Sequence, residues 1–309
     1  MVQKGYHAIH IANGNSTTHN IFMSQLAPVL EVDEYIEQAY FFHAFRMRQL
    51  DGQPSQEILS RIHEEILAIT RLQMAVQFMA TELRHTGMLS TAVARLNHYF
   101  TPFQAFVLGK AEEEGQRFGM ATALEVLEHE AQYRSQKPTP QGLFVYQFEV
   151  LCRNRLGYDD GLNAMMLDSY YSADWREYIE MVRVNVGEIE FADLVFIRSE
   201  VYAVEHRARE SALELPPVLF GEKEGKIARA NRGRDPLFLF AALQRHLNYP
   251  KVPFIRKMDN PLQQMPTILA KLRELEQRLK HLENEARDIG RFNATSQLET
   301  LKPIELDEQ

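Results

Sequence analysis

Residues 31–52 read EVDEYIEQAYFFHAFRMRQLDG, with a strong helical periodicity. Mainly apolar positions recur in steps of three and four residues, the spacing at which side chains share one face of an α-helix. These positions are Val32, Ile36, Ala39, His43, Met47 and Leu50. Asp51-Gly52 ends the pattern, because glycine accepts backbone conformations that stop a helix. The stretch therefore predicts an amphipathic helix with one apolar stripe.

The same periodicity continues downstream of this helix. After Pro54 it predicts a second helical run, whose apolar positions are Ile58, Ile62, Ile66, Ile69, Val76 and Leu83. Thr101-Pro102 and Thr139-Pro140 predict helix starts, because threonine caps the first turn and proline at the first position loses no hydrogen bond. Breaks between helices are expected near Gly52, Gly87, Gly115, Pro138 and Gly157.

These patterns predict an all-α protein with a bundle-like body over residues 29–215. A longer helix is expected from 191 to 213, and Pro216-Pro217 must end it because proline disfavours the helical conformation before it. We place a domain boundary there. A small basic helical module would occupy 216–257, while 1–28 is expected to be a flexible leader and 290–309 a disordered tail.

The C-terminal part carries a heptad repeat and predicts a coiled coil over 262–289. Its apolar positions alternate steps of three and four: Met265, Ile268, Leu272, Leu275, Leu279, Leu282, Ala286 and Ile289. Basic g positions Lys271 and Arg278 each precede an acidic e position, Glu276 and Glu283, by five residues, as in a parallel oligomer. We expect Leu272, Leu275, Leu279 and Leu282 to drive self-association. The alternative is an amphipathic helix that packs against the chain's own core.

Composition limits the class of protein. With 45% hydrophobic and 25% charged residues, the 309-residue chain has an ordinary globular composition. No run approaches the 18 or more apolar residues of a membrane-spanning helix, so no membrane insertion is expected. Cys152 is the single cysteine and cannot form an internal disulfide. A cytoplasmic location is the interpretation that fits a lone cysteine and no apparent secretory signal.

Glu82 and His85 are the candidate metal ligands. They form an ExxH pair one helical turn apart, an arrangement that carboxylate-rich iron bundles use to chelate one ion. Such a bundle needs a second ExxH pair on another helix, which the sequence lacks. The alternative interpretation is a surface glutamate beside a histidine near a helix end, and we predict that the pair binds no metal. We likewise interpret His43 as a hydrogen-bonded core histidine.

Residues 221–227, GEKEGKI, resemble a phosphate-binding loop only in part. The two glycines are one residue too close, and Ile227 stands where such a loop needs serine or threonine to bind Mg²⁺. A turn that leads into a helix is the better interpretation of this stretch.

Charge is distributed unevenly along the chain. Between Lys223 and Lys257 nine basic residues face two acidic ones, a balance of +7. Since the whole chain carries −8, the remainder carries −15. A basic face of this kind can meet an acidic protein or nucleic acid, or can simply be solvated. The residues predicted to bind a partner are Arg229, Arg232, Arg234, Arg245 and Lys251.

No catalytic motif or cofactor fingerprint occurs in the sequence. The leading hypothesis is a non-enzymatic, oligomeric helical adaptor or scaffold that needs no cofactor. One alternative is a ferritin-like metal-binding bundle built around Glu82 and His85. The other is a nucleic-acid-binding protein that uses the basic module.

Overall fold

The computed structural model describes residues 29–113, 115, 117–207, 216–254 and 279. Internal contacts divide the chain after residue 255 into two units. Of the second unit only Leu279 is described, and it is helical with 61% of its surface exposed. The predicted leader, tail and coiled coil otherwise lie outside the described residues.

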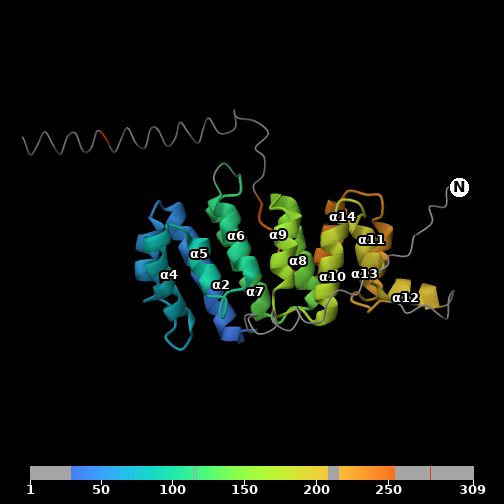
Figure 1. The fold of residues 1–309 in the computed structure, drawn as a ribbon, viewed down its shortest axis with the longest axis horizontal. Coiled ribbons are helices and arrows are strands. Elements are labelled where there is room, and N and C mark those ends of the chain that lie inside the picture. Colours follow the sequence, from blue (N-terminus) through green and yellow to red (C-terminus); the bar gives the residue numbers. More distant parts are fainter. Residues whose placement is uncertain (1–28, 114, 116, 208–215, 255–278, 280–309) are drawn as a thin grey trace, which may run out of the picture. The chain divides into compact units, whose positions relative to one another are not determined.

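The described part of the first unit is built from helices alone, as predicted (Figure 1). No strand forms in it, and only two isolated bridges join Val186 to Ile189 and Ser199 to Phe220. None of its helices has the length and apolarity needed to cross a membrane. The helices are α2 (Val32–Leu50), α3 (Ser55–Ile62), α4 (Leu72–Thr86), α5 (Leu89–Arg95), α6 (Pro102–Glu112), α7 (Met120–Ser135), α8 (Pro140–Asn154), α9 (Tyr158–Met166), α10 (Ala173–Asn185), α11 (Phe191–Phe196), α12 (Glu200–Arg207), α13 (Glu222–Ala230) and α14 (Pro236–Leu247).

Local signals set several helix ends where the sequence predicts them. Gly87 adopts φ of +73° directly after α4, and its N–H donates to the carbonyl of Leu83. Thr101 caps α6 by accepting a hydrogen bond from the N–H of Gln104, whose side chain accepts from the N–H of Thr101 in return. Thr139 caps α8 with one hydrogen bond, which its side chain accepts from the N–H of Gly142 at 3.2 Å. These starts and stops are confirmed.

The helical run expected between Pro54 and Gly87 is wrong in one respect, because it breaks into α3 and α4. Carboxylates of α2 hold the loop between them. Glu37 accepts a hydrogen bond from the N–H of Leu67 at 3.1 Å, and Glu34 accepts one from the N–H of Arg71 at 3.0 Å. These bonds replace those that a continuous helix would supply to the backbone.

The helix expected over 191–213 is also interrupted. α11 ends at Phe196 and α12 begins at Glu200. At the break, the carbonyl of Arg198 accepts hydrogen bonds from the N–H groups of Leu219 and Phe220, at 2.9 and 3.1 Å. A segment that follows the double proline therefore satisfies the backbone groups that the break leaves free.

Residues 216–254 share their core with the helices before them. Phe220 is fully buried, and its ring centroid lies 5.4 Å from that of Trp175 and 5.5 Å from that of Tyr178 on α10. Phe240 of α14 lies 5.5 Å from Phe191 of α11. The predicted boundary at 216 therefore does not separate two hydrophobic cores.

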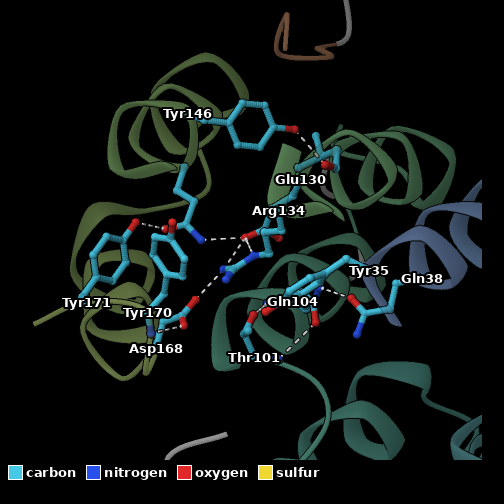
Figure 2. A network of polar contacts seen from close by, with 12 residues as sticks. Tyr35, Gln38, Thr101, Gln104, Glu130, Arg134, Tyr146, Asp168, Tyr170 and Tyr171 are labelled. Carbon is cyan, nitrogen blue, oxygen red and sulfur yellow. Dashed lines mark hydrogen bonds and ion pairs between the residues drawn. The ribbon is translucent and has the colours of Figure 1, made fainter. Parts of the chain in front are cut away.

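A buried polar network ties α7 to α8 and to the segment after α9 (Figure 2). Arg134 donates to Glu130 on its own helix at 2.8 Å and also to Asp168. Gln147 of α8 donates to Glu130 at 2.7 Å and accepts from the hydroxyl of Tyr171 at 2.7 Å. The three charged side chains are buried, so the network fixes one side of α7 against the core.

Glu130→Gln should make stability less sensitive to a rise in pH above about 4.5, the ordinary pKa of this carboxyl. Burial raises the pKa of the Glu130 carboxyl above its ordinary value of 4.5. Such a group contributes stability below its unfolded-state pKa and loses that contribution as the pH rises through its folded-state pKa. Glutamine cannot ionise and still offers an oxygen to Arg134 and Gln147. The free energy of unfolding of the variant relative to wild type should therefore rise with pH, by up to about 1.4 kcal/mol for each unit of pKa increase.

Urea unfolding at a series of pH values from about 4 to about 8 measures this difference. A difference that stays constant with pH would show that Glu130 keeps an ordinary pKa in the folded protein.

Candidate functional site

α2 and α7 lie side by side (Figure 1), and the ion pairs between them show that they run antiparallel. Nδ1 of His43 lies 3.0 Å from Oε1 of Glu128. One turn further along α2, Arg46 pairs with Glu128 at 3.1 Å and with Glu125 at 3.5 Å. Later residues of α2 thus contact earlier residues of α7, as expected for antiparallel helices. Glu125 and Glu128 of α7 therefore bind the exposed side of α2 through His43 and Arg46.

The predicted apolar stripe of α2 is largely on the surface of the single chain. Exposure is 50% for Ile36, 42% for Tyr40, 43% for Met47 and 61% for Leu50. The side chain of His43 is also 50% exposed, so its interpretation as a core histidine is wrong. We call Ile36, Tyr40, Met47 and Leu50 the α2 strip.

The opposite side of α2 provides the buried face. Phe41, Phe42 and Phe45 are almost fully buried there, and they bury more apolar area than the smaller side chains of the strip. Glu34 and Glu37 can share this face because they accept hydrogen bonds from the α3–α4 loop. α2 therefore has two apolar sides, of which the aromatic one is covered.

The α3–α4 loop extends the apolar surface beside the strip. Leu67 is 53% exposed and Ile69 is 84% exposed. Their loop is held against α2 by the bond from Leu67 to Glu37 and by the hydroxyl of Tyr40, which donates to Glu65 at 3.0 Å. An exposed apolar surface of several neighbouring side chains is typical of a protein interaction site.

A hollow of about 390 Å³ opens between α2 and α7 beside the strip. Its lining residues are Ile36, Ala39, Tyr40, His43, Glu128, Gln132 and Ser135. The four from α2 are spaced i, i+3, i+4 and i+7, the set that forms the hole for one side chain in coiled-coil packing. The hollow is therefore shaped to receive a side chain from a facing helix.

The residues considered for metal binding do not converge. Glu82 pairs with Arg95 and His85 is exposed near the end of α4. Nδ1–H of His129 donates to the carbonyl of Lys251 at 3.0 Å, away from His43, which pairs with Glu128. Among the described residues, no three histidine, cysteine or acidic side chains form a group that could hold a metal ion.

The predicted partner-binding basic residues fall into two classes. Arg229 pairs with Glu205 and Arg232 pairs with Asp193, each at 2.5 Å, and both guanidinium groups lie over the ring of Phe196. These two arginines are used inside the chain. The other three predicted residues are exposed, and their own side chains make no hydrogen bond or ion pair within the described residues: Arg234, Arg245 and Lys251.

Residues 221–227 begin α13, as the interpretation of a turn before a helix predicts. Gly225 lies against Ser199, and a Cβ at this glycine would lie 2.4 Å from the serine Oγ. The second glycine of the stretch therefore permits close packing of α13 on the α11–α12 break.

No family model, curated protein or solved structure matches this chain. A function can therefore be inferred only from the chemistry of its surfaces. Sequence reasoning missed Tyr40, Arg46 and Glu128 as parts of the α2–α7 site. The helical spacing of Tyr40 from Ile36 and Met47 could have indicated that Tyr40 shares their side of the helix. No local pattern in the sequence links α2 to Glu128.

Proposed function

We propose that the protein is a non-enzymatic helical adaptor or scaffold that joins other protein chains through apolar helix faces. The observation that carries this proposal is the α2 strip, where four large, mainly apolar side chains remain exposed along one helix next to a hollow of about 390 Å³. Soluble monomers rarely leave an extended apolar surface uncovered. The lone Cys152 supports a reducing compartment, and we place the protein in the cytoplasm.

The C-terminal heptad is the second element of the proposal. Leucines at its core positions would join copies of the chain as a parallel dimer or trimer. Leu279, which occupies one of these positions, is helical and 61% exposed, and a second helix would cover it.

Arg234, Arg245 and Lys251 support a further contact. Their charged groups are exposed and have no side-chain partner among the described residues. We propose that they bind an acidic protein surface. Binding of nucleic acid is the competing possibility, and it would weaken steeply as salt concentration rises because phosphate contacts release counterions.

Leu275→Asp should weaken self-association without destabilising the helices of residues 29–254. The substitution places an unpaired carboxylate at a central d position of the heptad, which costs several kcal/mol when the position is covered. In light scattering over a dilution series, the variant should fall towards the 35.9 kDa of one chain at a higher concentration than wild type. Its melting temperature should not change.

The opposite pattern, an unchanged mass with a lower melting temperature, would mean that the segment packs on its own chain. A wild-type protein that is monomeric at every concentration would contradict the scaffold proposal.

A further inference from the structure

We infer that the α2 strip is covered by α2 of a second copy of this chain, packed antiparallel about a two-fold axis close to His43. This inference rests on the proposed function and names its partner. It concerns a second interface, separate from the heptad segment. Three properties of the surface support it: the fit of side chains, the distribution of charge and the size of the contact.

The first property is the match between the hollow and a side chain of the same helix. In an antiparallel pair centred on residue 43, positions equally far from 43 face each other. Ala39, which lies between Ile36 and His43 in the wall of the hollow, then faces Met47 of the second copy. Met47 is exposed, unbranched and flexible, so it suits an irregular hollow. By symmetry each copy inserts one methionine and receives one.

The same register pairs the rest of the strip. Ile36 and Leu50 lie seven residues on either side of 43 and face each other in the two copies. Both are at least half exposed in the single chain. Three of the four strip residues, Ile36, Met47 and Leu50, thus meet an apolar side chain, while Tyr40 faces Arg46 of the second copy.

The second property is the charge along α2. Exposed Glu31 and Asp33 lie at its N-terminal end, whereas Arg46 and Arg48 lie towards its C-terminal end. An antiparallel pair brings opposite charges and opposite ends of the helix dipoles together, while a parallel pair opposes like charges. Both arginines also bind carboxylates of their own copy, so they contribute little binding energy to the dimer. Charge therefore sets the direction of pairing, and the apolar side chains supply the affinity.

The third property is the size of the surface. A stable interface buries about 800 Å² on each partner. The strip extends over about 21 Å, at 1.5 Å per residue from Ile36 to Leu50, and is one helix wide. It covers only part of that area by itself. Leu67 and Ile69 on one side and the α7 wall on the other supply more, so α2, α7 and their copies would form a four-helix arrangement.

Cysteine cross-linking of the full chain tests the pairing and its direction. His43→Cys should form a disulfide-linked dimer on oxidation, because the two residues face each other across the axis and a disulfide needs Cα atoms within about 7 Å. Burial raises the pKa of the native Cys152 thiol to about 12, so it should stay unreactive under the same conditions. Non-reducing gels and mass spectrometry identify the product.

Two further variants give the direction independently of His43. A mixture of Ile36→Cys and Leu50→Cys should cross-link, whereas Ile36→Cys alone should not, because its two copies would lie about 21 Å apart along the helix. Cross-linking of Ile36→Cys alone would overturn the antiparallel arrangement. As a control, Met74→Cys on α4 is 74% exposed and lies outside the strip, and cross-linking at residue 43 no more efficient than at residue 74 would overturn the inference.

Mass in solution separates this interface from the heptad. In the Leu275→Asp chain, Met47→Glu should lower the residual dimer mass to that of one chain, while the matched Met74→Glu should leave it unchanged. An equal mass for the two glutamate variants would reject pairing through α2. If residue 43 fails to cross-link while Leu275→Asp weakens assembly as expected, this inference fails and the proposed function stands.

Discussion

Arg134→Met should lower the free energy of unfolding by about 3–5 kcal/mol, one of the two largest effects expected for a single substitution in this protein. The guanidinium of Arg134 is the cation between two buried carboxylates, Glu130 and Asp168. Methionine keeps an unbranched aliphatic stem but carries no guanidinium and no charge, so the two buried acidic groups lose their cationic partner. Urea unfolding at neutral pH measures the change.

Two companion variants isolate the electrostatic cause. Arg84→Met changes an exposed arginine on α4 that has no described side-chain partner, and its effect should stay within about 0.5 kcal/mol. Asp168→Asn added to Arg134→Met should recover part of the loss, because the buried negative charge is removed together with its partner. A double variant that is less stable than Arg134→Met alone would contradict the charge explanation.

This network shows why the sequence predicts the elements of the core better than their chemistry. Glu130 and Arg134 are four residues apart on one helix, a spacing that usually indicates a pair on a solvated surface. Their burial depends on Asp168 and Gln147, which lie in other elements. No periodicity within α7 contains that information, since it is created by the way α8 and the segment after α9 pack.

The fold class and many helix ends could be predicted because they depend on neighbouring residues. Thr101 and Thr139 cap helices through atoms three residues away, and Gly87 ends α4 through its own backbone freedom. The loop between α3 and α4 could not be predicted in this way. Glu34 and Glu37 hold it from a distance of about thirty residues in sequence.

The candidate site shows a different limit. The spacing of Ile36, His43 and Met47 correctly indicates one side of a helix, but periodicity does not tell which of two apolar sides is covered. The second side, with Phe41 and Phe45, packs into the core because its larger rings bury more apolar area. The sequence therefore indicates the strip but does not show that it stays exposed. An apolar pattern of this kind that is left on the surface suits an interface.

Phe220→Ala should lower the free energy of unfolding by about 3–5 kcal/mol and should do so for the whole described unit in one transition. The ring of Phe220 is fully buried among Phe144, Trp175 and Tyr178. Its removal leaves a cavity between the segment after the double proline and helices α8 and α10. Fluorescence of Trp175, the single tryptophan, and far-UV circular dichroism follow the unfolding.

The two signals distinguish one core from two. If residues 216–254 fold with the preceding helices, both signals should shift together to lower urea concentration, because the cavity weakens a core that all these helices share. If 216–254 were a separate module, circular dichroism would show a second transition at the wild-type midpoint. Phe238→Ala, at a ring of α14 that is 65% exposed, should change stability by at most about 0.5 kcal/mol. The contrast between Phe220 and Phe238 therefore assigns the effect to the shared core, since both rings belong to the same short segment of the chain.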